Sequence, residues 1–211
     1  MYVSEKYKFV YMAPQKTAST SIASVLVSEF DAFIYTNWEH QPARPEILLS
    51  PNGYLKHLNC LPNEFADYFV FASIRNPYCR MSSMYEENKK YNQANKLVDL
   101  PSFKNYLVER LTCRIRHPHS MYGQLNLGCD PPKGCVKFEI SALVRMENLN
   151  EDFNKLPFVN TPVTLPHLNK SSFNKYSQEM ANLVFTHQRN DFEKFGYSKT
   201  PPRKIIFKEF L

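Results

Sequence analysis

A lysine followed by hydroxyl side chains gives the first candidate site, between a predicted strand and a predicted helix. Residues 14–21 read Pro-Gln-Lys-Thr-Ala-Ser-Thr-Ser, so that Lys16 precedes a run rich in serine and threonine. Free backbone N–H groups and the helix dipole favour an anion such as phosphate at a helix N-terminus, and Lys16 adds a positive charge. The segment predicts an anion-binding loop; the plainer alternative is a helix capped by serine or threonine.

A second segment with similar properties follows the most apolar predicted strand. Residues 75–83 read Arg-Asn-Pro-Tyr-Cys-Arg-Met-Ser-Ser, so Arg75 stands where the chain leaves the strand and Ser83 follows two helical turns later. An arginine at a strand end, together with a serine downstream, is able to clamp another phosphate. The alternative is a surface arginine and an ordinary helical serine.

The chain lacks the glycines that nucleoside triphosphatases use around phosphate. A Walker A loop reads Gly-x4-Gly-Lys-[Ser/Thr], whereas the five glycines of this chain lie elsewhere, at positions 53, 123, 128, 134 and 196. Such an enzyme also needs an aspartate for magnesium at the end of a neighbouring strand, where this chain has Arg75. The two segments together indicate a site that holds two anionic groups by cationic and N–H donors, without a metal.

Alternating strands and helices must position these two segments. Short apolar runs bounded by breakers predict strands at residues 9–12, 68–74 and 142–146. Apolar spacing and capping residues predict helices at 19–30, 77–87, 102–114, 149–156 and 177–195, the last with Gly196 as its C-cap. Prolines and glycines indicate mainly loops in segments 31–62, 115–137 and 161–174. The pattern predicts an α/β fold with three layers, a central parallel sheet flanked by helices. We expect one domain over residues 1–211, with ligands at the carboxyl ends of the strands.

Composition and charge narrow the class of protein. The chain has 211 residues, of which 43% are hydrophobic and 14% aromatic, enough for a substantial core. No run approaches the ~20 apolar residues of a membrane span, and the N-terminus has no signal-peptide hydrophobic segment, so we expect a soluble, cytoplasmic chain. The net charge of +6 suits an anionic ligand. Its lysines and arginines are scattered, which argues against a nucleic-acid partner.

The five cysteines predict no disulfide framework. Their odd number, without a signal peptide, indicates reduced thiols. Cys129 and Cys135 lie near His117 and His119, so a zinc site is conceivable. Their spacing differs from that of a standard zinc knuckle, and we expect no metal.

Five segments in the right order resemble sulfotransferases that use 3′-phosphoadenosine 5′-phosphosulfate (PAPS). Residues 16–21 resemble their 5′-phosphosulfate loop, usually Pro-Lys-Thr-Gly-Gly-Thr-Ser, and residues 75–85 resemble their motif Arg-[Asp/Asn]-Pro-x-x-Arg-x-x-Ser-x-Tyr. Three further segments resemble the carbohydrate (Golgi-type) branch: Arg-Met-Glu-Asn-Leu from residue 145 with Asp152-Phe153, His-Leu-Asn-Lys-Ser from residue 167, and Asp191-Phe192 with Phe-Gly-Tyr from residue 195. The resemblance covers about residues 9–197.

The resemblance implies a P-loop-like domain, PAPS as donor and a role for each matched residue. It implies that Lys16 is catalytic and stabilises the leaving 5′-phosphate, and that Arg75 and Ser83 hold the 3′-phosphate. The expected cofactor-binding residues are Lys16, Thr17, Ala18, Ser19, Thr20, Ser21, Arg75, Ser83 and Lys170, the last near the sulfonate. Ala18 and Ser19 replace the usual pair of glycines. An alanine fits there if the backbone is helical, and it weakens binding if φ must be positive.

The base that accepts the proton of the acceptor hydroxyl is expected in the segment before the second strand. His57, followed by Leu58, resembles a Gly-His-Leu pattern of carbohydrate sulfotransferases, in which a histidine or glutamate enters the site. The rivals are Glu46, His40, His119 and His167, and His57 is otherwise a surface loop histidine. Arg145 and Glu147 are interpreted as a structural ion-pair feature.

Two other classes of function stay open. One is a nucleotide phosphotransferase of the P-loop class, which would consume ATP with magnesium. The other is a non-catalytic module that binds a nucleotide but has lost its base. The acceptor, expected to be a carbohydrate or another hydroxyl compound, would be recognised by segments 31–62 and 115–137, where the sequence pattern is least informative.

Overall fold

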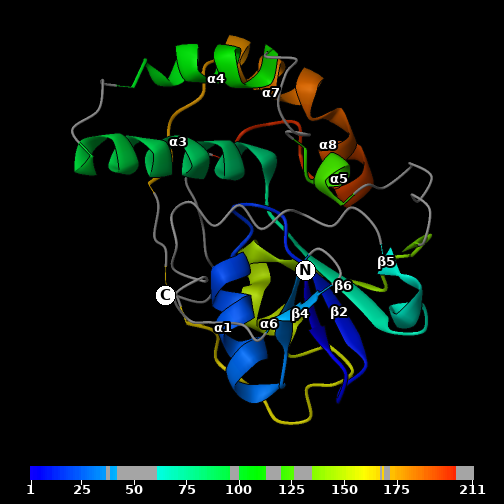
Figure 1. Cartoon of the computed structure of the whole chain (residues 1–211). Helices are drawn as coiled ribbons and strands as arrows, with labels where there is room; N and C mark the ends of the chain where they lie inside the picture. The colour runs from blue at the N-terminus through cyan, green and yellow to red at the C-terminus, as the bar shows by residue number, and fades with distance from the viewer. Residues whose placement is uncertain are drawn as a thin grey trace.

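The computed structural model describes residues 1–36, 39–41, 61–95, 100–112, 120–125, 135–166, 168 and 172–202. Its strands are β1 (Tyr2–Ser4), β2 (Phe9–Met12), β3 (Phe33–Thr36), β4 (Glu39–Gln41), β5 (Leu61–Pro62), β6 (Phe69–Ile74), β7 (Cys135–Val136) and β8 (Ala142–Arg145). Its α-helices are α1 (Ser19–Glu29), α3 (Pro77–Ala94), α4 (Phe103–Thr112), α5 (Met121–Gln124), α6 (Leu149–Phe153), α7 (Gln178–His187) and α8 (Arg189–Phe195), and its 3-10 helices are η1 (Asn63–Phe65) and η2 (Met146–Asn148). Figure 1 shows their arrangement.

A mixed sheet forms the centre, in the strand order β4-β3-β1-β2-β6-β8. The half that carries both candidate segments is parallel, because β6 pairs in parallel with β2 and with β8. The other half is antiparallel, from β1 to β3 and β4. The α/β prediction is confirmed; the antiparallel extension was not expected. Residues 5–8 connect β1 to β2, and so short a connection allows only antiparallel pairing.

The three parallel strands are apolar because both faces of the sheet are covered. Along β2, Phe9 and Tyr11 point to the face under α1, whereas Val10 and Met12 join the core on the opposite face. Strand β6 alternates in the same way. The continuous apolar runs in the sequence therefore correspond to strands buried on both sides.

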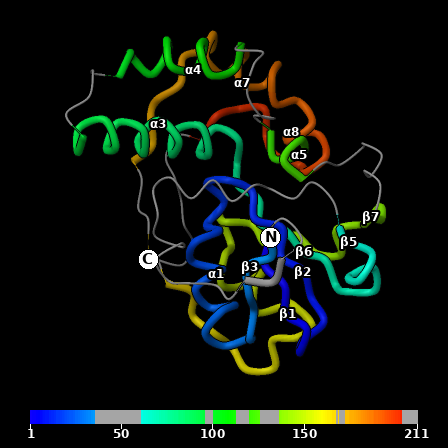
Figure 2. Tube along the Cα trace, in the orientation of Figure 1, coloured from blue at the N-terminus to red at the C-terminus, as the bar shows by residue number. Residues whose placement is uncertain are grey.

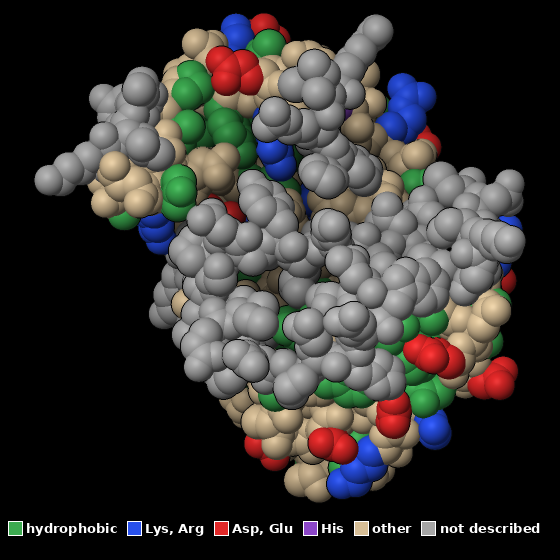
Figure 3. Space-filling model, viewed as in Figure 1, with side chains coloured by type: hydrophobic (Ala, Val, Ile, Leu, Met, Phe, Trp, Pro, Cys, Tyr) green, Lys and Arg blue, Asp and Glu red, His purple; other side chains and the backbone are tan. Residues whose placement is uncertain are grey.

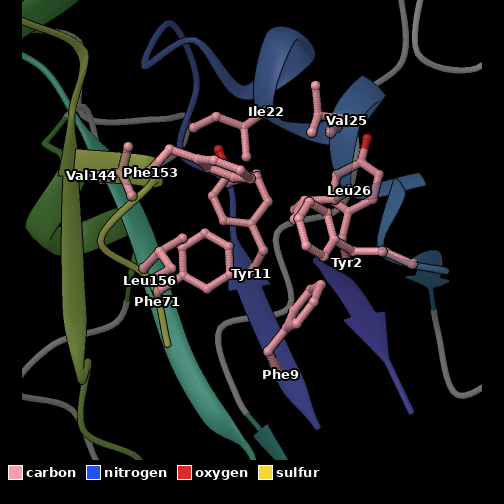
Figure 4. Packing of buried hydrophobic residues seen from close by; sticks show 14 of the residues in the cluster. Tyr2, Phe9, Tyr11, Ile22, Val25, Leu26, Phe71, Val144, Phe153 and Leu156 are labelled. Atoms are coloured by element: carbon pink, nitrogen blue, oxygen red, sulfur yellow. The ribbon is translucent and has the colours of Figure 1, made fainter. Parts of the chain in front are cut away.

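Aromatic rings fill the core between α1, α6 and the sheet (Figure 4). Tyr11 stacks on Phe71 with ring centroids 4.9 Å apart, and Phe9 stacks on Phe158 at 4.2 Å. Phe158 also meets Phe30 edge-to-face at 5.3 Å. Such pairs add to the hydrophobic gain from burying the rings, so α1 and the strand before it are held in a fixed relation.

A separate layer of helices lies beyond the sheet edge at which β6 ends (Figure 2). Helices α3, α4, α7 and α8 share one apolar core, which includes Tyr78, Met81, Leu107 and Val184. The predicted helix at 77–87 is longer in the structure, since α3 continues to Ala94. This layer presents one face of α3 to the loop after β2.

The predicted helix over residues 177–195 is wrong as a single element. The chain breaks at Gln188, whose φ of −118° and ψ of 27° end α7, and α8 begins at the next residue. Gln188 is buried and its side-chain amide donates to the sulfur of Met81 at 3.1 Å. The break turns Asp191 and Phe192 inward, and both are buried. Gly196 ends α8 in the left-handed region, as expected.

The described surface is mixed in charge. On the face shown in Figure 3, the described lysines and arginines lie in several separate places, near aspartates and glutamates. Within the described ranges, no helix has both the length and the apolar character that crossing a bilayer requires.

Candidate functional site

The loop between β2 and α1 has a left-handed backbone at two positions. Lys16 has φ of 66° and Ala18 has φ of 65°. Ala18 is the N-cap of α1, and no side chain caps the helix there, so the predicted serine or threonine cap is wrong. The first backbone N–H groups of a helix have no acceptor within it. Residues 19–21 therefore present N–H groups at the positive end of the helix dipole, where an anion is stabilised.

Hydroxyl groups beneath the loop form a chain with a fixed direction. The Thr17 hydroxyl donates to the carbonyl oxygen of Pro14 at 2.7 Å, and it lies 2.6 Å from the Ser73 hydroxyl. Since a hydroxyl carries one proton, Ser73 must donate to Thr17. The Tyr11 hydroxyl, 2.6 Å from Ser73, must then donate to Ser73. The proton of the Thr17 hydroxyl is thus used within the loop, so Thr17 would donate to a ligand through its backbone N–H group.

Side chains from other elements hold the backbone of the loop. The Arg80 Nε atom donates to the carbonyl oxygen of Gln15 at 2.8 Å, and Arg75 Nη1 donates to that of Lys16 at 3.3 Å. From α5, the Gln124 side chain accepts from the Gln15 N–H at 2.9 Å. The end of β6, the start of α3 and α5 therefore fix the loop's shape, including the left-handed turn at Lys16.

One face of α3 lines the loop. Arg80, Ser83 and Glu87 are three and four residues apart, so they share a helix face. At one end of the row Arg80 contacts Gln15, and at the other Glu87 forms an ion pair with the Lys16 ammonium at 2.8 Å. Ser83 lies between them, 4% exposed. The structure thus brings together Lys16, Arg75 and Ser83, which the sequence assigned to one site.

Buried charge surrounds the base of the loop. Arg75 and Arg80 are 2% and 0% exposed. Burial lowers the pKa of each guanidinium; Asp191 opposes this shift at Arg80, and Cys79 and Glu147 oppose it at Arg75. Desolvation raises the pKa of Asp191, whereas the charge of Arg80 lowers it. Two buried cations beside the loop favour an anionic ligand.

The Asp191 carboxylate also fixes the start of α5. Its two oxygens accept from the N–H groups of Met121 and Tyr122, at 2.8 and 2.7 Å. Helix α5 in turn supplies Gln124 to the loop. The residue at the beginning of the late Asp-Phe segment therefore supports the anion-binding loop from a distance.

Arg145 and Glu147 both contact the late Phe-Gly-Tyr segment, and the ion-pair feature expected of them stays a prediction. Glu147 accepts from the Asn76 N–H at 2.7 Å and from the Tyr197 hydroxyl at 3.2 Å. Arg145 lies over the Tyr197 ring at 5.1 Å and donates to the carbonyl oxygen of Phe195. Three of the matched segments are thus held together at the start of α3.

The remaining hydroxyl residues of the loop lie on α1. Ser19 and Thr20 are half-buried and Ser21 is buried, so the first two are the better placed of the three to offer hydroxyl groups as well as backbone N–H groups. Their contacts with a donor stay predictions.

Several predicted residues lie outside the described residues. They are His57, Lys170, Glu46, His119 and His167, together with the His117 and Cys129 of the conceivable zinc site. The side chains of His40, in β4, and of Cys135, in β7, also lie outside them. Among the described residues, no group of three or more His, Cys, Asp or Glu is placed to hold a metal ion. The base and the absence of a metal stay predictions.

Two residues of the site were not assigned by the sequence. Arg80 holds the loop backbone, and Glu87 pairs with Lys16. Their positions relative to Ser83, three residues before it and four after it, could have revealed both, because that spacing places them on the face that Ser83 presents.

Comparison with known proteins agrees with this geometry. The model of the sulfotransferase family matches residues 1–198, which is nearly the whole chain. No curated protein and no solved structure matches the chain. A lysine loop at a helix N-terminus, a strand-end arginine beside it and a family match across both segments lead to one assignment: the chain belongs to the sulfotransferase family.

Proposed function

We propose that this protein transfers a sulfuryl group from PAPS to a hydroxyl group of a carbohydrate, and that residues 1–211 act as one domain without a metal. The observation that carries the proposal is the cationic loop after β2. There Lys16 and the uncapped N-terminus of α1 lie beside Arg75 from the neighbouring parallel strand. Family membership supports sulfuryl transfer in general, and the motif resemblances support the donor and the acceptor class.

The loop fits the 5′ end of this donor. When bound, PAPS supplies an activated sulfuryl group on its 5′-phosphate. The N–H groups at the start of α1 and the Lys16 ammonium hold that phosphate and stabilise the charge it gains as it leaves. Arg75 and Ser83 hold the 3′-phosphate, and Lys170 contacts the sulfonate. This grip aligns the sulfur with the incoming oxygen.

Transfer needs one proton to leave the acceptor. The bond between the acceptor oxygen and sulfur forms while the bond from sulfur to the 5′-phosphate oxygen breaks. A side-chain base takes the hydroxyl proton, and His57 is the residue we assign to it. Positive charge at Lys16 and in the loop balances the negative charge on the leaving group, so the residues of this chain supply each requirement.

Donor binding is tested by thermal shift with 3′,5′-adenosine bisphosphate and with ATP. We expect stabilisation by the bisphosphate, because the two phosphates reach the loop and Arg75 together. Stabilisation by ATP with magnesium alone, accompanied by ATP consumption, would identify the phosphotransferase alternative and overturn the proposal.

Transfer is tested with radiolabelled PAPS and a panel of sugars, using Lys16→Ala. We expect a loss of at least about a hundredfold in kcat, the usual scale for removing one group that stabilises a leaving charge. The matched control is Lys104→Ala, since Lys104 forms an exposed ion pair with Glu179 at 2.7 Å on α4 and α7. Full activity of Lys16→Ala would refute the assignment of the loop.

The base is tested separately by His57→Ala. We expect bisphosphate binding to persist and turnover to fall, because only proton transfer is impaired. Near-normal turnover would direct attention to Glu46 or His119. Binding without turnover in the unaltered protein, across the whole panel, would identify the non-catalytic module.

A further inference from the structure

The Lys16 ammonium already has a carboxylate partner. Its Nζ atom lies 2.8 Å from Glu87 Oε1, and the Lys16 side chain is 17% exposed whereas that of Glu87 is 61% exposed. A phosphate that binds to Lys16 must either displace this carboxylate or share the ammonium with it, and in both cases the two anions lie close together. From these contacts, and resting on the proposed donor, we propose that Glu87 competes with the donor's 5′-phosphate for Lys16.

The position of Glu87 makes this competition direct. Glu87 belongs to the α3 face that contacts the loop through Arg80 and presents Ser83. Its carboxylate therefore stands at the edge of the phosphate site and not on a remote surface. A dianion near Lys16 would also lie close to this carboxylate. The two negative charges would repel each other, and the repulsion is stronger where the protein excludes part of the water.

The exposure of Glu87 makes the contact reversible. An ion pair with one partner open to water is weak, so a phosphate that also accepts from several N–H groups of the loop displaces the Glu87 carboxylate. Once the phosphate leaves, Glu87 pairs with Lys16 again. The carboxylate thus keeps Lys16 ordered beside the loop while the site is empty, and it lowers the affinity for the donor and for the bisphosphate product.

The first test compares two isosteric substitutions on neighbouring residues of α3. Calorimetry measures the Kd of 3′,5′-adenosine bisphosphate for the unaltered protein, Glu87→Gln and Glu86→Gln. We expect Glu87→Gln to bind roughly fivefold more tightly or better. Glu86→Gln removes the same charge but lies on another face, where Glu86 accepts from Asn174 at 3.0 Å, so we expect a change below about twofold. Equal changes in both variants would overturn the proposal.

The second test asks whether Glu87 acts through Lys16. In a Lys16→Ala background, Glu87→Gln should no longer improve bisphosphate binding, because the ammonium for which Glu87 competes is absent. An improvement that persists there would overturn the proposal. Loss of sulfuryl transfer by Glu87→Gln at unchanged bisphosphate affinity would also overturn it, since the carboxylate would then act in the chemical step.

Inorganic pyrophosphate separates this proposal from the proposed function. Tighter pyrophosphate binding by Glu87→Gln, with no preference of the protein for the bisphosphate over ATP, would support the competition and refute PAPS as donor. Bisphosphate binding that Glu87→Gln leaves unchanged would refute the competition alone. Failure of every variant to bind any of these anions would refute both. Raising the salt concentration should reduce the gain from Glu87→Gln, because screening weakens exposed charges.

Discussion

Replacing Ala18 by glycine isolates the left-handed backbone at the N-terminus of α1. Ala18 has φ of 65° and ψ of 20°, and it closes the loop directly before the helix. The Cβ atom of an L-residue is strained in this region, whereas glycine adopts it freely. The related sulfotransferase motif has glycine at this position, so the substitution restores the residue that the backbone favours.

Two opposing terms set the magnitude for Ala18→Gly. Removing the left-handed strain stabilises the fold by about 1–2 kcal/mol. The extra freedom of glycine in the unfolded chain costs about 0.4–1 kcal/mol. The net gain is therefore about 0.5–1 kcal/mol, which corresponds to a rise in Tm of roughly 1–4 °C for a chain of this size.

Urea unfolding and a thermal melt measure this gain, and Ala66→Gly is the matched control. Ala66 is exposed and has φ of −55° and ψ of −34°. Glycine there relieves no strain and brings only the entropic cost, so we expect Ala66→Gly to destabilise the protein. The two substitutions, chemically identical, should have opposite signs.

A shared sign would refute the reasoning. If Ala18→Gly destabilised the protein as much as Ala66→Gly, the loop would not need its left-handed turn at Ala18. We also expect the bisphosphate to bind Ala18→Gly at least as tightly as the unaltered protein, since the N–H groups of the loop keep their directions at lower cost.

Two other predictions concern buried hydroxyl groups. Ser73→Ala should lower the free energy of unfolding, measured in urea, by about 1–3 kcal/mol, because the buried Tyr11 hydroxyl loses its acceptor. Tyr11→Phe should lower it less, since Ser73 still donates to Thr17. Equal losses would contradict the donor–acceptor direction assigned to these three hydroxyl groups. Burial raises the pKa of Tyr106 to about 12, so the fold retains a proton that the unfolded chain releases near pH 10, and stability falls as pH rises from about 10 to 12. Tyr106→Phe should reduce this fall in stability, and a pH dependence of stability that Tyr106→Phe leaves unchanged would contradict the prediction.

The parallel half of the fold could be predicted because its strands carry their own signal. Strands such as β2 and β6 are buried on both faces, so each appears as an unbroken apolar run with a breaker at its end. β1 has three residues and is followed by a charged segment, so it gave no such signal. β3 is as long as β2, but the prolines and the glycine further along residues 31–62 favoured loops for the whole segment. The break at Gln188 was hidden because an apolar spacing continues through it.

For the candidate site, the sequence pointed to residues that the structure places around one loop, but it did not predict their contacts. Lys16 and Arg75 were identified because their types and positions fit an anion. An alanine gives no indication of a positive φ, which at Ala18 accompanies a loop held by side chains from distant elements. Likewise, the Tyr11–Ser73 contact joins residues 62 positions apart, and no local pattern encodes it.

The hydrogen bond between Gln15 and Gln124, and those from α5 to Asp191, mean that the loop after β2 gains part of its support late in synthesis. A ribosome delivers β2, the loop and α1 first, and the antiparallel pairs β1–β2 and β1–β3 need only the first 36 residues. The loop gains Arg80 midway through synthesis, but α5 has its anchor only once residue 191 has emerged. A nascent chain can thus pair much of its sheet while the loop after β2 still lacks part of its support, so binding of an anion at this loop would distinguish a chain in which residue 191 has folded from one that is still being translated.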